Sequence, residues 1–534
     1  LPINPPIHAE IRLFFLMTPA TPTSKPQASN SHIVPLLLIS LPIFIGALDL
    51  TVVSAVLPHV IYDLEIPLQT GLDEAAWVVT GYLLAYSVAM TFMGRLSDLY
   101  GRRKIYLLAL AIFAFGSYLV AVADTWPTQW SLRATFLLTR ARPDPAQTAL
   151  QTLILARMVQ AFGGGAMVPV GMALVGDLYP AGQRARPLGV IAAVDTAGWV
   201  IGHLYGGIIV RYFDWRVIFW LNLPICVLAF VLIILVLRGL PQPRQEGKLD
   251  WIGALLISAG LALLNAGLGT NVEGGTAATG GLPPYAGASV AGAVGLLLLF
   301  VVWQARAKYP LIPLSLFRRR NFSAASAANF LTGFGLFVAI ANVPLFINTL
   351  VAETLEQGAW DSGWMLSALT VPMALAAIPG GMLAARWGYR WPSLAGLIGA
   401  IAGLGWMSTW EAGTMYGEMI PHLLLAGVGF GVLIAPVAAA VVDAAPETHR
   451  GTASALVIIF RLVGMTVGVS SLTTYGVFRA NVLSLQWLPA GADFAEVARV
   501  AMEVAAQVIG ETFWIAAGVT ALALIPVIFL KDDV

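Results

Sequence analysis

The sequence predicts an all-α polytopic membrane protein with fourteen transmembrane helices. Hydrophobic residues make up 58% of the 534 positions and charged residues only 11%, and the mean hydropathy is +0.81. Soluble domains carry about 25% charged residues, so this composition lies far outside their range. The apolar residues also fall into runs of roughly 20 or more, the length that crosses a bilayer as a helix. The net charge of +1 gives no support to a nucleic-acid partner.

The fourteen runs follow one another along the whole chain after a proline-rich, Ser- and Thr-rich segment, 1–32, which predicts a disordered cytoplasmic tail. Several runs are longer than a bilayer requires, which predicts tilted or extended helices. The predicted spans are 34–60, 74–97, 103–124, 149–174, 187–210, 217–237, 250–270, 286–304, 323–350, 361–385, 391–410, 419–443, 452–477 and 510–530.

The cations between the spans predict the orientation. With the N-terminus inside, eighteen Lys and Arg residues fall in inside loops. Seven fall outside, namely Arg133, Arg140, Arg142, Arg211, Arg216, Arg479 and Arg499. Because cytoplasmic loops carry the excess of cations, both termini are predicted to be cytoplasmic. The first span directs insertion into the plasma (inner) membrane.

Two outside segments are longer than a turn. Residues 124–148 are rich in Trp, Pro and Arg, and residues 493–507 have helical spacing within the segment 479–510. The second predicts an amphipathic helix near the outer surface, and a passive connector is the alternative. The loop 270–284 is rich in Gly and Thr and is expected to be flexible.

A short charged loop, Gly94–Lys104, interrupts the apolar sequence with the pattern Gly-x-x-x-Asp-x-x-Gly-Arg-Arg-Lys. A second stretch, Gly381–Arg390, keeps both glycines and the last arginine but lacks the acid. This internal repeat predicts two related halves, as in duplicated transporters. The predicted units are a six-helix half at 33–238, an inserted two-helix hairpin at 249–305, and a second six-helix half at 321–534.

These motifs resemble those of the major facilitator superfamily, in its fourteen-helix drug:proton antiporter branch. The matching stretches are the loop Gly94–Lys104, Leu48–Pro58 in the first span, Arg157 with Gln160 and Gly163 in the fourth, and Asp214–Pro224 at the sixth. The resemblance implies the fold of that superfamily. It also implies a cytoplasmic gate formed by Gly94, Arg95, Asp98, Gly101, Arg102 and Arg103.

The motif detail is closest to the mycobacterial exporters of triacylglycerol-like lipids, which work beside a lipid-carrying lipoprotein. The shared stretches are WVVTGYLLAY from Trp77, GHLYG from Gly202, and Gly451–Val469. The resemblance therefore implies a periplasmic or outer-surface lipoprotein partner. This chain departs from the pattern at His203, where a proline is usual, and at Thr196, where a glutamate is usual. Asp195 is adjacent and is a candidate replacement for that acid.

Asp49 lies near mid-membrane in the first span, where an ionised side chain is costly by roughly 2.5 to 3.5 kcal/mol. It is therefore a candidate proton carrier, the alternative being a permanent ion pair between helices. Arg461 lies at comparable depth, and we predict that the two pair across the halves. Asp195 and His203 are two further titratable groups on one face of the fifth span. His203 is alternatively a neutral packing residue.

Other residues have supporting roles in this interpretation. Arg157, accompanied by Gln160, is expected to organise the fourth span or to relay protons. Gly202 and Gly206 form part of a small-residue stripe that allows close helix packing. Asp443 and Arg450 lie at helix ends as a second gate or as interfacial residues. The candidates for a substrate cavity, which packing roles also explain, are Asn329, Asn342, Trp364 and Phe430.

The predicted function is proton-coupled export of a hydrophobic substrate, a lipid such as triacylglycerol, by alternating access. A multidrug:proton antiporter shares every motif named above, and a passive lipid scramblase is the next alternative. No Gly-x-x-x-x-Gly-Lys segment for ATP is present, so the proton gradient is the expected energy source and no cofactor is expected. The six His residues lack metal-ligand spacing, and neither a metal site nor an enzyme is predicted. The expected state is a monomer in contact with membrane lipids.

Overall fold

A computed structural model gives the fold of the 534-residue chain. It describes residues 33–66, 75, 77–140, 142–180, 182–238, 244, 247–268, 285–352, 355–489 and 493–531, without some side chains inside the helices. The predicted tail, 1–32, and the loop 270–284 lie outside the described residues.

The described residues form helices joined by short turns, with no β-strand among them. The first half contains α1 (Ile33–Asp63), α3 (Trp77–Tyr100), α4 (Arg102–Ala121), α5 (Trp126–Thr139), α6 (Pro145–Leu178), α7 (Ala185–Tyr212) and α8 (Arg216–Val236). A hairpin follows, formed by α9 (Trp251–Leu268) and α10 (Ala286–Arg306). The second half contains η3 (Leu314–Arg318), α11 (Arg320–Phe346), η4 (Ile347–Val351), α12 (Leu355–Trp387), α13 (Arg390–Met407), α14 (Tyr416–Ala444), η5 (Glu447–His449), α15 (Arg450–Trp487), α16 (Phe494–Leu522) and α17 (Leu524–Ile528).

Every predicted span corresponds to a helix. Twelve helical segments in the described part are long and apolar enough to cross a membrane. The remaining two predicted spans, 250–270 and 391–410, are the 18-residue helices α9 and α13. The chain is therefore an all-α, multi-pass membrane protein.

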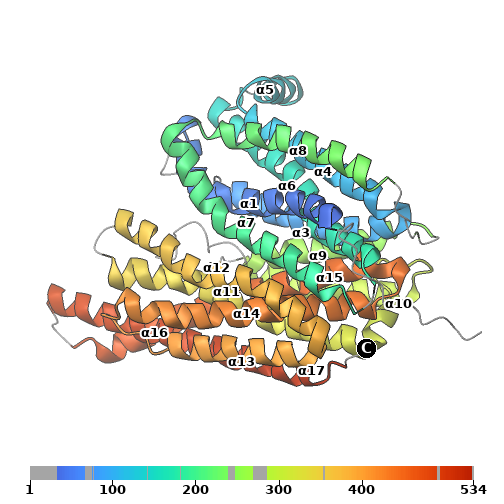
Figure 1. Ribbon diagram of the computed structural model, residues 1–534. Helices are drawn as coiled ribbons and strands as arrows, with labels where there is room; N and C mark the ends of the chain where they lie inside the picture. The colour runs from blue at the N-terminus through green and yellow to red at the C-terminus, as the bar shows by residue number, and fades with distance from the viewer. Residues whose placement is uncertain are drawn as a thin grey trace, which may run out of the picture.

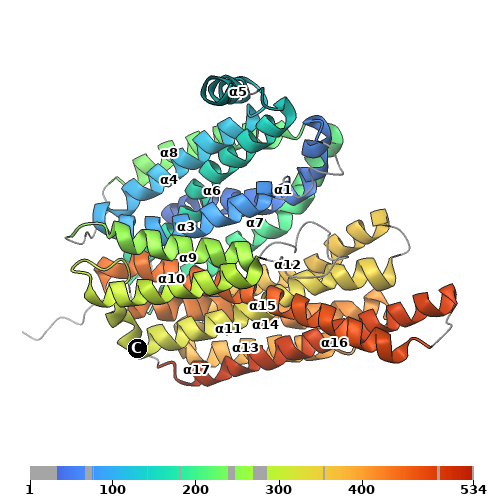
Figure 2. The ribbon, with the colours of Figure 1, turned by 180° about the vertical axis from the view of Figure 1, so that it is seen from behind.

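The two halves form two lobes that lie together at one end and diverge toward the other, as both ribbon views show (Figure 1 and Figure 2). We call the end that holds residues 94–104 the loop end, and the other the opposite end. Helices α7 and α12 pack against each other between the lobes, and α15 packs against α3 and α6. The hairpin α9–α10 packs against α3.

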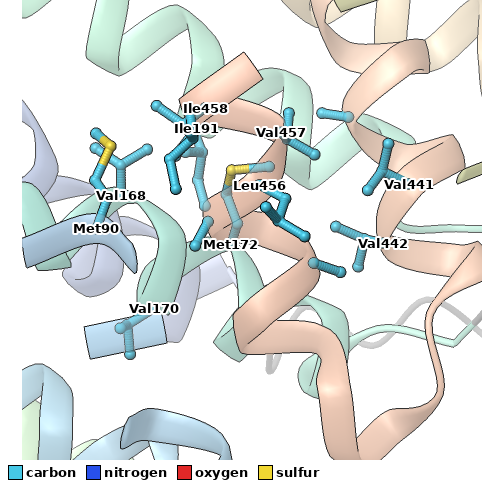
Figure 3. Close-up of a cluster of buried hydrophobic side chains, with 14 of the residues drawn as sticks. Met90, Val168, Val170, Met172, Ile191, Val441, Val442, Leu456, Val457 and Ile458 are labelled. Carbon is cyan, nitrogen blue, oxygen red and sulfur yellow. The ribbon is translucent and has the colours of Figure 1, made fainter. Parts of the chain in front are cut away.

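A buried apolar cluster connects the halves. It includes Met90 of α3, Met172 of α6, Ile191 of α7, Val442 of α14 and Leu456 of α15. Figure 3 shows side chains of this cluster converging from these helices. Apolar side chains from both halves thus share one core near the loop end.

Two outside segments differ from expectation. Residues 126–139 form a helix, α5, within the segment 124–148, for which the sequence predicted no secondary structure. Residues 494–522 form one continuous helix, α16, so the predicted surface helix at 493–507 is instead an extension of the last span. Val500, Val504 and Val508 of this extension are buried with Leu483 of α15, because the two helices continue together past the bundle.

Candidate functional site

Asp49 of α1 lies at the centre of a polar cluster inside the first half. Its Oδ2 is 2.6 Å from a guanidinium nitrogen of Arg157 on α6. Its Oδ1 accepts a hydrogen bond from the amide of Gln160, at 2.9 Å, and one from Asn222 of α8, at 3.3 Å. Gln160 also donates to the hydroxyl of Ser117 on α4, at 2.8 Å. Four helices of one half therefore meet at this carboxylate.

The local sequence explains this geometry. Arg157 and Gln160 are three residues apart, so they are neighbours on one face of α6, and Arg157 donates to Gln160 at 2.7 Å. Gly116 allows α4 to approach the backbone of Gln160 so closely that a Cβ there would overlap it. The guanidinium also lies 4.1 Å from the ring centre of Tyr82. A charged pair removed from water needs this many partners to be tolerated.

Asp195 of α7 forms a second centre, which joins the two halves. Its Oδ2 is 3.7 Å from a guanidinium nitrogen of Arg461 on α15. The two side chains are 11% and 18% exposed, whereas those of Asp49 and Arg157 are 0% and 1% exposed. The other oxygen of Asp195 is buried without a hydrogen-bond partner among the described residues. The Asp195–Arg461 pair therefore has a longer distance and more exposed side chains than the Asp49–Arg157 pair, and one of its carboxylate oxygens accepts no hydrogen bond from a described residue.

A small cavity of about 30 Å³ lies beside the Asp195–Arg461 pair. Asp195 and Arg461 line it together with Asn329, whose side chain donates to the backbone oxygen of Val457. The volume exceeds the space that one water molecule needs. The polar lining of this cavity includes the carboxylate of Asp195 and the guanidinium of Arg461.

These contacts correct the predicted pair of Asp49 with Arg461. Each of the two residues has a different partner, Arg157 for Asp49 and Asp195 for Arg461. Similar depth in the membrane does not fix which face of a helix a side chain occupies, and only facing side chains can pair. Arg157, expected to organise the fourth span, does so through the Asp49 carboxylate.

At the loop end, Asp98 connects α3 to the first turn of α15. Its carboxylate accepts hydrogen bonds from the backbone N–H groups of Gly451 and Thr452, at 2.9 and 2.8 Å, and from the Thr452 hydroxyl, at 2.9 Å. A carboxylate is favourable at this position because the first N–H groups of a helix lack partners within it. Gly94 allows α3 and α15 to approach closely enough for these hydrogen bonds, since a Cβ there would lie 2.9 Å from the Gly451 oxygen.

Arg102 extends this contact. It lies 3.3 Å from Asp98, donates to the Glu447 backbone oxygen at 2.5 Å, and forms an ion pair with Asp177 of α6. Asp177 in turn pairs with Arg450 at 3.2 Å. Gly101 supports the turn before α4 with a φ of 97°, which favours glycine. The loop residues thus bind the two halves together.

The second copy of the loop makes a related contact, without a carboxylate on the start of the facing helix. A Cβ on Gly381 would meet the backbone of Ala185, so α12 approaches the start of α7 as α3 approaches the start of α15. Ala385 stands where the first copy has Asp98. The start of α7 has no side-chain cap, and Asp443 instead binds Arg184 and Tyr389.

The remaining predicted residues have varied surroundings. Arg95 is buried, and Arg103 donates to the Leu237 backbone oxygen at 2.8 Å. Gly202 packs against Leu48 and Thr51 of α1, and Gly206 is buried. His203 lies in α7, but its side chain is outside the described part.

The other cavity candidates do not line the Asp195 cavity. Asn342 donates to the Thr512 hydroxyl at 2.7 Å, Phe430 is buried in the core of the second half, and Trp364 is 58% exposed beside Trp360. Within the described residues, no group of three or more His, Cys, Asp or Glu could hold a metal ion.

Sequence reasoning missed Asn222, Ser117 and Asp177. Asn222 lies in the quoted stretch Asp214–Pro224, and an amide within an apolar run was the available signal. Ser117 and Asp177 carry no pattern of their own, since only the folded structure shows their partners.

Residues 39–469 and 325–534 match the Major Facilitator Superfamily. The chain belongs to this superfamily. Its members are transporters, not enzymes. The chain is 33% identical over 82% of its length to a triacylglyceride transporter of Mycobacteroides abscessus, covering 81% of that protein. It is 32% identical over 83% of its length to a probable triacylglyceride transporter of Mycobacterium leprae, covering 84% of it.

Solved structures show the same fold at low sequence identity. The proton:xylose symporter XylE aligns with a TM-score of 0.59 at 15% identity, over 92% of this chain and 94% of the symporter. The human organic anion transporter MFSD10 aligns with a TM-score of 0.59 at 15% identity, over 93% of this chain and 100% of that protein. Both comparisons show that the chain shares the fold of these transporters.

Proposed function

We propose that this transporter exports a hydrophobic substrate, a lipid such as triacylglycerol, across the plasma membrane in exchange for protons. The loop end and both termini face the cytoplasm in this proposal. The printed names of the mycobacterial relatives, at 32% and 33% identity, support a lipid substrate. The observation that carries the coupling is the ion pair of Asp195 with Arg461, because it joins the two halves beside a cavity.

Proton binding at Asp195 changes the attraction between the halves. The ionised carboxylate is drawn to Arg461 at 3.7 Å, which favours the arrangement in which α7 and α15 are close. Protonation removes the negative charge and with it this attraction. The equilibrium between inward-facing and outward-facing states then shifts by the lost interaction free energy.

Asp49 serves this mechanism less well than Asp195. Its oxygens are occupied by Arg157, Gln160 and Asn222, and all three belong to the same half. A proton arriving there has to displace a complete set of partners. Loss or gain of a proton at Asp49 also leaves the contact between the two halves unchanged. We therefore assign Asp49 the role of a permanent ion pair, the alternative that the sequence left open.

Reconstituted vesicles with an imposed pH gradient test the proposal. The purified transporter is compared on a fluorescent triacylglycerol analogue and on a lipophilic cationic dye. We expect gradient-stimulated movement of the lipid analogue and little movement of the dye. Gradient-driven movement of the dye alone would identify a multidrug antiporter. Lipid movement that ignores the gradient would identify a scramblase.

A further inference from the structure

The helix α5 has no part in the proposed transport mechanism, yet it carries a large uncovered apolar face. It follows the end of α4 and precedes the start of α6, so it lies at the opposite end of the bundle. In Figure 1 and Figure 2 it is seen along its axis while the spans are seen from the side. It therefore runs across the spans, outside the first lobe, in the direction of a membrane plane.

The turns at both ends hold α5 in this position. The Thr128 hydroxyl donates to the Ala123 backbone oxygen at 2.6 Å, and Asp124 pairs with Arg216 of α8 at 2.5 Å. After α5, Asp144 caps α6 by accepting from the N–H of Ala146 at 3.2 Å. The helix packs against α6 on the side of the buried Thr128.

The side that faces away from the bundle is apolar and uncovered. Trp130 is 71% exposed, Leu137 67% and Leu138 85%. Trp126, Trp130 and Leu137 fall on one stripe at helical spacing, opposite the packed side. A stripe of Trp and Leu on a helix parallel to the membrane plane matches the boundary between headgroups and acyl chains, where Trp is enriched.

Three cations complete the surface. Arg133 lies on the same face as the apolar stripe, between Trp130 and Leu137, and Arg140 and Arg142 follow the last turn; all three are exposed. The stem of an arginine can lie along an apolar surface while its charge reaches the headgroups. No carboxylate in the described part pairs with any of them. Basic residues at the edge of an interfacial helix attract anionic headgroups.

We propose that α5 is an interfacial lipid-binding helix, with its Trp and Leu stripe in the bilayer boundary and its arginines on the headgroups of anionic phospholipids. It would tie the outer end of the first half to the membrane while the second half moves. Its occupant is the bilayer surface, because the exposed Trp and Leu side chains and the exposed cations share the face of α5 that is turned away from the bundle.

The depth of the stripe is the first test. Spin labels are attached to Trp130→Cys, Leu298→Cys and Glu411→Cys in the full chain in nanodiscs, where Cys226 is buried. Leu298 is an exposed apolar residue of α10, and Glu411 an exposed residue of a turn. We expect the label at 130 to collide with oxygen more than with a water-soluble nickel complex, as the label at 298 does. Nickel access equal to that at 411, or protection from both reagents by another protein surface, overturns the proposal.

The cations are the second test. The variant Arg133→Gln/Arg140→Gln/Arg142→Gln is compared with Arg499→Gln, an exposed residue at the same end that pairs with Glu503 at 2.7 Å. Bound phosphatidylglycerol and phosphatidylcholine are measured by native mass spectrometry. We expect the triple variant to lose phosphatidylglycerol at least about fivefold, since each basic residue contributes about that factor. Equal retention by both variants contradicts the proposal.

Discussion

Asp49 and Asp195 are both buried carboxylates that face an arginine, on two helices, α1 and α7, that pack against each other. They differ in where the arginine lies. Arg157 belongs to the same half as Asp49, whereas Arg461 belongs to the half opposite Asp195. An ion pair inside one half can persist while the halves move relative to each other, but the distance across an ion pair between the halves has to change. An ion pair within one half can therefore have a structural role, whereas an ion pair between the halves can couple proton binding to their movement.

Breaking the Asp49 pair is expected to have the largest effect on stability. Asp49→Asn leaves the Arg157 charge buried, 1% exposed, without its counter-charge. Removing one partner of a buried ion pair typically costs about 3 to 5 kcal/mol. The measurement is the unfolding temperature of the purified transporter in detergent.

The double variant Asp49→Asn/Arg157→Gln provides the control. Because it removes both charges, we expect it to recover part of the lost stability. If the single variant is as stable as the parent, Asp49 is not the structural pair proposed here.

A smaller loss is expected from removing one donor to Asp49. Asn222→Ala deletes a hydrogen bond to a charged group, for which about 1.5 to 3 kcal/mol is typical. Asn342→Ala is the matched control, because Asn342 donates to the neutral Thr512 hydroxyl and a loss nearer 1 kcal/mol is expected. Equal shifts in unfolding temperature for the two variants would show that the Asp49 cluster is not specially stabilised by Asn222.

The smallest stability change is expected at the second centre. Asp195→Asn removes a pair that is too long for a hydrogen bond, at 3.7 Å, and that lies beside a cavity large enough for water, so the unfolding free energy should fall by only about 1 kcal/mol. Unfolding in detergent again measures it, side by side with Asp49→Asn. A loss at position 195 as large as that at position 49 would remove the distinction between the centres.

Much of the fold could be predicted because its signals are local in sequence. Each of the fourteen apolar runs corresponds to a helix, and twelve helical segments in the described part of the chain are long and apolar enough to cross a membrane. The copied loop at Gly381–Arg390 predicts two halves. The helix α5 was not predicted, since its Trp, Pro and Arg content conceals the helical periodicity. The Pro at its first turn is compatible with a helix, because the N–H that proline lacks is unpaired there in any case.

The site could be predicted only in part, for a reason that is geometric. Asp49, Arg157, Asp195 and Arg461 are conspicuous in sequence because charges within spans are costly. Which of them pair depends on helix rotation and on the packing of α1 against α6, α7 and α8. The sequence alone does not contain that information, so it predicts the wrong arginine for Asp49 and no role for Asn222.

The central claim is that the proton acts at Asp195, between the halves, and not at Asp49. The most direct measurement is the ratio of lipid export with and without a pH gradient, in vesicles holding equal amounts of folded parent, Asp195→Asn or Asp49→Asn/Arg157→Gln protein. We expect Asp195→Asn to lose the gradient response at least about fivefold, as the removal of a coupling of roughly 1 to 3 kcal/mol implies, while the double variant retains it. A retained response in Asp195→Asn, with loss of the response in the double variant, would contradict the account.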